Sequence, residues 1–412
     1  MLKFGSLFLS VLILLSITSH FFAGIPLLSA TSEDITPVLL DVQDPPVAFA
    51  GSDAKTHLVY ELGMRNFTSG TVTVEQVEIL GDGSSIATLD TAEIATRLQP
   101  FGRRDSVSSL AASMAALLFI HVTLPQGHSV PKTLVHRVHL RAEAAPPGQQ
   151  EIIESGGKLT VDRQPVVVIG PPLHGAGYIS ADSCCDAARH TRAALPVNGR
   201  FWIAQRFAVD WEQIDDQHRI YHGPQNQDES YTIWGKEALA VTDATVASVT
   251  DKYPSQTPGQ YPTNISFDEA DGNSVVLDLG HRRYALYAHL QQGKIRVHAG
   301  DTVKRGQVLG LVGNSGNSIA PHLHFHLMST PIPLAANGLP YEIDRFQVTG
   351  ATAGTEAFDE AESKGTALPF TPFSPPHEVK AGMPLDQLIL SFAPESAVAR
   401  DTRPPLDKRP AP

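Results

Sequence analysis

Residues 309–327 read LGLVGNSGNSIAPHLHFHL and carry the most specific pattern in the chain. Residues 313–317 are typical of a loop, because Gly, Asn and Ser tolerate turn conformations or bond their own backbone. Side chains alternate along a strand, so we expect His322, His324 and His326 to share one face while the apolar residues between them face a core. Neutral imidazole is a common metal ligand and a base near neutral pH. The pattern therefore indicates a site for a metal ion or for proton transfer.

The length and composition are those of a globular protein with two domains and tails. The chain has 412 residues, of which 42% are hydrophobic and 18% charged, and its net charge is −12. So acidic a chain is not a general binder of nucleic acid, and we expect no nucleic-acid partner. Its 32 glycines and 31 prolines favour many turns and short strands over helical bundles. We therefore predict an all-β fold.

The first 30 residues are typical of an export signal. Lys3 precedes an apolar run over residues 7–17, and a second apolar patch extends to Leu28. We predict that residues 1–30 are a signal peptide or an uncleaved N-terminal anchor, since the combined stretch is long enough to span a bilayer. The protein is therefore expected to be secreted, periplasmic or attached to the cell envelope. Contact with a membrane is expected only through this segment, and the sequence gives no oligomeric state.

Three regions follow the signal. Residues 36–165 contain short alternating apolar runs separated by turn residues, which predicts an immunoglobulin-like β-sandwich that serves as a spacer or adhesion module. Residues 178–348 contain further short strands with long loops. Residues 349–412 are predicted to be an extension, with an apolar piece at 382–392 and a disordered tail over 394–412 rich in Pro and charge.

Two local features of the second region bear on the chemistry. The segment 201–211, FWIAQRFAVDW, is predicted to be one strand, which would place Arg206 and Asp210 on the same face. The cysteines Cys184 and Cys185 are adjacent. In an exported protein such neighbours can form a vicinal disulfide, pair between chains or remain free, and the sequence leaves these outcomes open.

The second region resembles the lysostaphin/LytM family of zinc endopeptidases, which cut peptidoglycan cross-bridges. The resemblance covers residues 196–345. It is carried by the segment 240–248, by YAHL at 287–290, by AGDTVKRGQVLGLVGNSGNS at 299–318 and by PHLHFHL at 321–327. It implies a LytM-type antiparallel β-sheet domain, one Zn²⁺ ion and a peptidoglycan or other peptide substrate.

The resemblance also implies roles for individual residues. Asp210 and His324 would be zinc ligands, and His322 and His289 would be the catalytic pair. In this hypothesis the zinc lowers the pKa of its water towards about 7 and polarises the scissile carbonyl. His322 accepts the proton of the water, and His289 donates a hydrogen bond to the developing oxyanion. His326 stands where the family often has an acidic residue, and we predict that it orients His324 from the outer shell.

One position departs from the family pattern. Family members place a zinc-binding His four residues before the ligating Asp, but this chain has Arg206 there, preceded by Gln205. A guanidinium group is not deprotonated in proteins and cannot bind a cation. A catalytic zinc normally has three protein ligands. By position, therefore, one ligand is missing.

Three explanations account for the missing ligand. In the first, another histidine supplies it, and His190 is favoured over the other candidates, which are His218, His222 and His326. In the second, Asp210 and His324 hold the metal in a water-rich sphere assisted by Gln205. In the third, Arg206 occupies the metal position and pairs with Asp210, and the domain is inactive.

The sequence thus predicts an exported zinc metalloendopeptidase that hydrolyses peptide bonds in peptidoglycan cross-bridges. The alternative is an inactive LytM-like domain that acts as a cell-wall binding or regulatory protein. A swinging-arm carrier is a third class, because AGDTVKRGQVLG resembles the hairpins of biotinyl and lipoyl domains. Lys304 has no neighbouring Met and precedes a histidine cluster that a carrier does not need, so this class is disfavoured.

Overall fold

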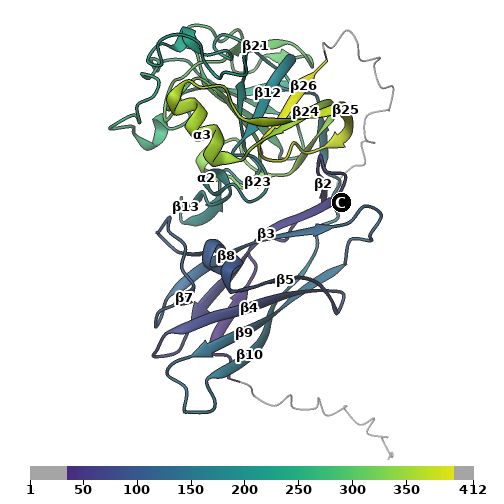
Figure 1. Ribbon diagram of the computed structural model, residues 1–412, viewed down its shortest axis with the longest axis vertical. Coiled ribbons are helices and arrows are strands. Elements are labelled where there is room, and N and C mark those ends of the chain that lie inside the picture. Colours follow the sequence, from purple (N-terminus) through teal and green to yellow (C-terminus); the bar gives the residue numbers. More distant parts are fainter. Residues whose placement is uncertain (1–34, 394–412) are drawn as a thin grey trace, which may run out of the picture. The chain divides into compact units, whose positions relative to one another are not determined.

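The computed structural model of the chain describes residues 35–393 (Figure 1). The predicted signal or anchor over 1–30 and the predicted disordered tail over 394–412 lie outside these residues. The described chain is mostly β, as predicted. Its helices are α1 (Thr91–Arg97), α2 (Ala188–Thr191) and α3 (Thr355–Lys364), with the 3₁₀ turns η1 (Asp228–Ser230), η2 (Phe267–Glu269) and η3 (Pro333–Ala335). No helix within 35–393 has the length and apolarity needed to cross a bilayer.

The N-terminal region contains two five-stranded sheets. The first has the order β1–β3–β8–β6, with β2 paired to β3; its strands are β1 (Val38–Asp41), β2 (Phe49–Ala50), β3 (Thr56–Asn66), β6 (Leu98–Pro100) and β8 (Ala115–Leu124). The second has the order β10–β9–β4–β5, with β7 paired to β4; its strands are β4 (Val72–Gly81), β5 (Ser84–Leu89), β7 (Ser109–Leu110), β9 (Thr133–Ala142) and β10 (Glu151–Thr160).

Alternating side chains from both sheets fill a single core. In β4, Val72 and Val74 are buried, and after a register shift the buried positions continue with Val77 and Ile79. A bulge inserts one residue and so restores the apolar side chains to the inner face. Residues of the other sheet, such as Leu58, belong to the same apolar cluster. The two sheets therefore form a sandwich, while its immunoglobulin-like type stays a prediction.

The remainder of the described chain is organised around one twelve-stranded sheet. Its main order is β11–β24–β26–β12–β15–β22–β19–β18–β17–β20, with β23 paired to β22 and β25 to β24. The strands are β11 (Val167–Ile169), β12 (Gly175–Ala181), β15 (Val209–Gln213), β17 (Ala244–Thr250), β18 (Asn273–Asp278), β19 (Tyr284–Leu290), β20 (Thr302–Val303), β22 (Leu323–Met328), β23 (Gly338–Leu339), β24 (Tyr341–Thr352), β25 (Phe370–Gly382) and β26 (Leu388–Phe392). Two small sheets pair β13 (Ala194–Val197) with β14 (Arg200–Ile203), and β16 (Glu237–Leu239) with β21 (Val308–Leu311).

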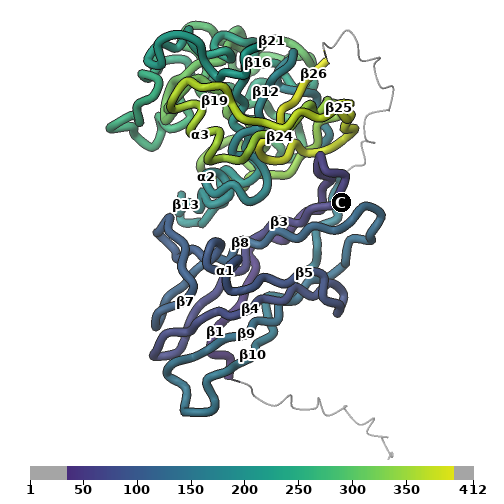
Figure 2. The backbone as a smooth tube through the Cα atoms, in the orientation of Figure 1, coloured from purple at the N-terminus to yellow at the C-terminus, as the bar shows by residue number. Residues whose placement is uncertain are grey.

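The ordered sheet continues past residue 348, where the sequence predicts an extension to begin. The strand β24 runs to Thr352, α3 and β25 follow, and β26 lies between β24 and β12 (Figures 1 and 2). Most side chains of β25 are exposed, and few residues of α3 are buried. A mostly solvated strand needs little apolar sequence, which is why the composition of this segment did not indicate a sheet.

The segment 201–211 is two strands, so the prediction of a single strand is wrong. The strand β14 ends at Ile203 and β15 begins at Val209, with a turn between them. Phe207 in this turn has φ 76°, a left-handed conformation that is unusual for a bulky residue. The turn ends the alternation of side chains, so Arg206 and Asp210 do not share a face. The neighbouring cysteines Cys184 and Cys185 are joined in a vicinal disulfide.

Candidate metal centre

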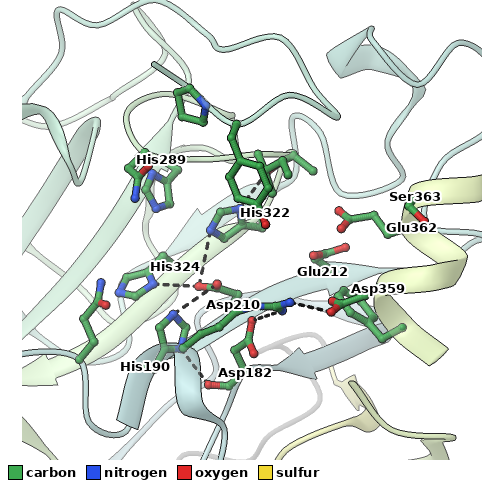
Figure 3. A pocket seen from close by; sticks show the side chains of 18 of the residues that line it. Asp182, His190, Asp210, Glu212, His289, His322, His324, Asp359, Glu362 and Ser363 are labelled. Atoms are coloured by element: carbon green, nitrogen blue, oxygen red, sulfur yellow. Dashed lines mark hydrogen bonds and ion pairs between the residues drawn. The ribbon is translucent and has the colours of Figure 1, made fainter. Parts of the chain in front are cut away.

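Three adjacent strands bring the central side chains together. The strand β15 pairs with β22 so that Asp210 lies directly opposite His324. On its other side β22 pairs with β19, where Ala288 lies opposite His324 and His289 follows. Residues directly opposite in neighbouring strands place their side chains on the same face. The carboxylate of Asp210 and the imidazole of His324 therefore meet, and Oδ1 of Asp210 lies 2.8 Å from Nδ1 of His324 (Figure 3).

The helix α2 contributes a further imidazole to the same carboxylate. His190 is only 6% exposed, and its Nε2 lies 3.3 Å from Oδ2 of Asp210 (Figure 3). One ligand atom from each of His190, Asp210 and His324 lies within 4.8 Å of the others. This trio can therefore hold a metal ion, and it contains the three residues that the sequence suggested as ligands.

A second group with ligand spacing shares His324. Ligand atoms of His289, His322 and His324 also lie within 4.8 Å of one another. The Nε2 atom of His322 lies 3.5 Å from Oδ1 of Asp210, and the rings of His289 and His322 are 4.6 Å apart at their centroids. The two predicted catalytic residues thus adjoin the predicted ligands.

Backbone carbonyls determine where the protons of these rings reside. The Nδ1 atom of His190 lies 2.8 Å from the carbonyl oxygen of Asp182, and Nδ1 of His322 lies 2.8 Å from that of Ala320. A carbonyl oxygen only accepts hydrogen bonds, so each Nδ1 carries a proton that it donates. In the neutral ring Nε2 then presents a lone pair, and in both residues it faces the carboxylate of Asp210. A metal ion between these nitrogens and the carboxylate, or a proton on a ring, can compensate the charge of Asp210.

The loop at 313–317 fixes the ring of His289 in the same manner. The Nδ1 of His289 donates to the carbonyl oxygen of Ser315 at 2.7 Å. Next to it, Gly316 has φ 79°, and a Cβ there would lie 2.4 Å from the backbone nitrogen of Gly272. Only glycine allows the loop to approach so closely. His289 itself has φ 61°, and backbone strain of this kind clusters at functional sites.

His326 lies next to His324 on β22. Its Nδ1 lies 3.0 Å from Nε2 of His324, so it can accept a hydrogen bond from Nε2–H of His324, and in that tautomer Nδ1 of His324 has a lone pair for a cation. The ring of His326 is 1% exposed, and its Nε2 has no hydrogen-bond partner within the described chain. An outer-shell role for His326, as the sequence predicts, stays a prediction.

Of the remaining predicted residues, Gln205 lines the same pocket as the ligands, whereas Arg206 pairs elsewhere. Arg206 donates to Oε2 of Glu61 at 2.7 Å, and both side chains are 8% exposed. The Arg206–Asp210 pair that the inactive-domain explanation requires is not formed, because the turn at 204–207 directs Arg206 elsewhere. His222 is exposed, and neither it nor His218 belongs to a metal-holding group among residues 35–393.

The carboxylate of Asp210 and the imidazoles around it shift one another's pKa values. Burial would raise the pKa of Asp210, but the imidazoles of His190, His322 and His324 hold it well below its usual value. Burial lowers the pKa of His190, but the carboxylates of Asp210 and Asp182 outweigh it and raise the pKa to about 9. Burial lowers the pKa of His324 despite Asp210. In the absence of a metal, therefore, a proton on His190 compensates Asp210.

The centre opens into a pocket of about 510 Å³. One wall is acidic and was not predicted from the sequence, since its carboxylates come from strands and from α3 in no recognisable motif. Burial and the charge of Glu362 raise the pKa of Glu212 well above its usual value. Burial and the charge of Asp359 raise the pKa of Glu362 to about 7.

Comparison with known proteins identifies the domain. Residues 233–336 match the family model of peptidase family M23. The chain therefore contains an M23 domain of the lysostaphin/LytM type, as the sequence predicted. The match includes His289, His322, His324 and His326, whereas Asp210 and His190 precede it.

Several curated proteins are similar over part of the chain. Peptidoglycan DD-endopeptidase ShyA of Vibrio cholerae is 38% identical over 84 residues, which is 18% of this chain and 19% of that protein. Glycyl-glycine endopeptidase ALE-1 of Staphylococcus capitis is 46% identical over 61 residues, 14% of this chain and 16% of that protein. An uncharacterized metalloprotease of Haemophilus influenzae is 26% identical over 161 residues, 38% of this chain and 33% of its own length. The chain thus spans a third or less of these relatives.

Solved structures also align with parts of the chain, at low TM-scores. A zinc-containing peptidase from Vibrio cholerae aligns with a TM-score of 0.21 at 15% identity, over 73% of this chain and 86% of that one. The catalytic domain of lysostaphin from Staphylococcus simulans aligns with a TM-score of 0.19 at 21% identity, over 38% of this chain and 77% of that one.

Proposed function

We propose that this protein is an exported zinc metalloendopeptidase that hydrolyses peptide bonds in peptidoglycan cross-bridges. One observation carries the proposal. The imidazoles of His190, His322 and His324 all lie next to the carboxylate of Asp210, at the M23 domain of the chain. The name of ShyA supports a peptidoglycan substrate, since this relative is called a peptidoglycan DD-endopeptidase, and ALE-1 is called a glycyl-glycine endopeptidase. A wall substrate in turn supports the predicted export.

The residues present fit a zinc ion. Asp210, His190 and His324 would hold it, which gives the three protein ligands of a catalytic site. Ligands around a tetrahedral zinc lie about 3.3 Å from one another, given bonds of about 2.0–2.1 Å. The Nε2 atom of His190 lies at this distance from Oδ2 of Asp210, whereas Nδ1 of His324 lies 2.8 Å from Oδ1 and would move apart from it by about 0.5 Å on binding. Zinc bound there would polarise a scissile carbonyl and lower the pKa of a water molecule.

His322 is suited to be the general base. Its Nδ1 proton is donated to the carbonyl of Ala320, so Nε2 has a lone pair next to Asp210, and the residue lines the pocket. A water molecule that enters the pocket can transfer its proton to this nitrogen as it attacks the peptide carbonyl. The same nitrogen can then return the proton to the departing amine.

The role of His289 differs from the sequence-based hypothesis. Its only neutral-ring proton is donated to Ser315, so Nε2 is an acceptor and has no hydrogen to offer an oxyanion. Burial and the neighbouring rings of His322 and His324 lower its pKa well below the usual value, which disfavours a second proton. We therefore propose that His289 accepts a hydrogen bond from the attacking water and so orients it toward the carbonyl.

Cleavage of isolated cross-linked peptidoglycan tests the proposal. The purified chain should release new free amines, lose this activity on treatment with a zinc chelator and regain it when zinc is restored. His322→Ala, which removes the base, is the matched control and should release none above background. Folded, zinc-free protein that binds peptidoglycan without releasing amines would favour the non-enzymatic cell-wall protein instead.

A further inference from the structure

A further cluster of possible metal ligands joins the sandwich to the second region of the chain. His57 on β3 and His121 on β8 are diagonal neighbours, because these strands pair with His57 opposite Thr123. Diagonal neighbours on adjacent strands share one face of the sheet. One ligand atom from each of His57, His121 and Cys185 lies within 4.8 Å of the others. Cys185 belongs to the segment between β12 and α2, so the cluster connects parts that are distant in sequence.

The two imidazoles lie in a chain of hydrogen bonds between two carboxylates. Their inner nitrogens, Nδ1 of His57 and Nε2 of His121, are 2.8 Å apart. The outer Nε2 of His57 lies 2.9 Å from Oδ1 of Asp53. The outer Nδ1 of His121 lies 2.9 Å from Oδ2 of Asp186. A carboxylate accepts hydrogen bonds, so each outer nitrogen carries the proton of its neutral ring. The inner nitrogens then direct lone pairs at each other, and a proton or a metal ion can bind between them.

This arrangement is the one that histidines adopt when they bind a metal. Such histidines donate their other ring N–H to a carboxylate, which fixes the tautomer and the direction of the lone pair. Burial would raise the pKa of Asp53, but the hydrogen bond with His57 helps to bring it below its usual value. Burial would likewise raise the pKa of Asp186, but His121 and Arg97 lower it. Burial lowers the pKa of His57 despite Asp53, which favours the neutral ring that a metal requires.

The sulfur of the cluster becomes a ligand only after reduction. Cys185 is joined to Cys184 in the vicinal disulfide, whereas a metal binds the thiolate. A dithiol reductant breaks the S–S bond: it supplies two electrons and two protons, leaves both cysteines as thiols and is itself oxidised to a disulfide. Zn²⁺ can then displace the thiol proton of Cys185 into the solvent. Thiolate and imidazole are both zinc ligands in proteins, and water can fill a fourth position.

We propose that reduction of the disulfide creates a second zinc site with His57, His121 and Cys185 as its ligands. Asp53 and Asp186 hold the two imidazoles in the required tautomers. Ligands around a tetrahedral zinc lie about 3.3 Å apart, so the inner nitrogens, now at 2.8 Å, would separate by about 0.5 Å. Zinc bound there would link β3 and β8 to the segment that leads into α2. The stability of the chain would then depend on its redox state.

Metal analysis of the full chain in both redox states tests this site. The protein is reduced with a dithiol, freed of it by gel filtration without air, incubated with zinc chloride and desalted. It should hold one more zinc per chain than the oxidised protein. With Co²⁺ in place of zinc, only the reduced protein should show a thiolate-to-cobalt charge-transfer band. The other metal centre cannot give this band, because Asp210, His190 and His324 contain no sulfur.

The two cysteines provide matched variants. Cys184→Ser leaves Cys185 without its disulfide partner and should bind the additional metal with no reductant, whereas Cys185→Ser should not bind it in either state. His121→Ala removes an imidazole ligand and should weaken Co²⁺ binding by more than about 100-fold. His128→Ala removes an exposed histidine of the same sandwich and should leave the band unchanged. Circular dichroism establishes that each variant is folded before it is compared.

The outcomes do not depend on the peptidase proposal. Zinc content and the cobalt band are compared between two redox states of one protein, whether or not the chain hydrolyses peptidoglycan. Equal zinc content in both states, or cobalt bound by the reduced protein without the band, would overturn the second site. A full-strength band in folded His121→Ala would also overturn it, because the cysteines would then bind the metal without this imidazole.

Discussion

The Nε2 atom of His190 lies 3.3 Å from the Oδ2 atom of Asp210. The helix α2 thereby brings an imidazole next to the carboxylate of Asp210. The family pattern has a histidine four residues before this Asp, where this chain has Arg206. The Nδ1 of His190 donates to the carbonyl of Asp182, so the lone pair of Nε2 is directed at the centre. On this pair of residues we base the proposal that the domain has three zinc ligands, with His190 in place of the histidine that is absent at position 206.

Replacement of His190 by alanine should therefore remove the metal. Loss of an outer-shell partner typically weakens metal affinity about 10–100-fold, and loss of a direct ligand is expected to cost more. Zinc content of dialysed protein, measured by elemental analysis, should fall from stoichiometric to near background. His222→Ala removes an exposed histidine and is the control that should keep its zinc. Full zinc retention in His190→Ala would show that another group is the third ligand.

Replacement of Arg206 should change stability but not metal binding. Arg206→Met leaves the buried carboxylate of Glu61 without its partner, and breaking a buried pair in this way costs about 3–5 kcal/mol. Denaturant unfolding should show this loss, and the double variant with Glu61→Gln should recover part of it because no buried charge remains. Zinc content should be unaltered in both. A gain or loss of zinc in the folded Arg206→Met protein would mean that Arg206 acts at the centre after all.

The two catalytic histidines should separate hydrolysis from metal binding. His322→Ala removes the proposed base and His289→Ala the acceptor that orients water, and contributions of this kind are typically about 10²–10⁴-fold in rate. Initial rates on a soluble cross-linked peptide should fall by this order in each variant, while the zinc content stays stoichiometric. Variants that lose zinc and activity together would instead assign the metal to the His289, His322 and His324 group.

His326 should influence the metal indirectly. His326→Ala removes the group that fixes the ring of His324, and zinc affinity should fall about 10–100-fold in a competition titration with a chromophoric chelator. His298→Ala is a suitable control, because that side chain is 91% exposed. Unchanged affinity in His326→Ala would show that the hydrogen bond between the two rings has no positioning role.

Local sequence patterns predicted the β fold and the histidine strand well. Alternation in PHLHFHL placed His322 and His324 on one face, and the M23 match includes both. The prediction of one strand over residues 201–211 was wrong because this segment is mostly apolar and aromatic, which is typical of a strand. The turn at Phe207 has a φ of 76°, and the sequence contains no Gly or Asn there that would have indicated it. The position of Arg206 could not be obtained from spacing alone, since the turn and the partner Glu61 decide it.

The ligand candidate from α2 illustrates a different limit. His190 was one of several histidines without a motif, and only the pairing of β12 with β15 brings the segment after β12 next to Asp210. The acidic wall was missed for the same reason, because Glu212 and Glu362 meet only when α3 folds back over the sheet. Long-range pairing, rather than local pattern, determines these contacts.

The most direct test of the metal centre is an anomalous-difference map from crystals of the zinc-loaded protein, collected on both sides of the zinc absorption edge. The account predicts one strong edge-dependent peak bounded by Asp210, His190 and His324, with His322 and His289 beside it but not bonded to it. A map without such a peak, or with a peak ligated by His289 and His322 and remote from Asp210, would contradict it.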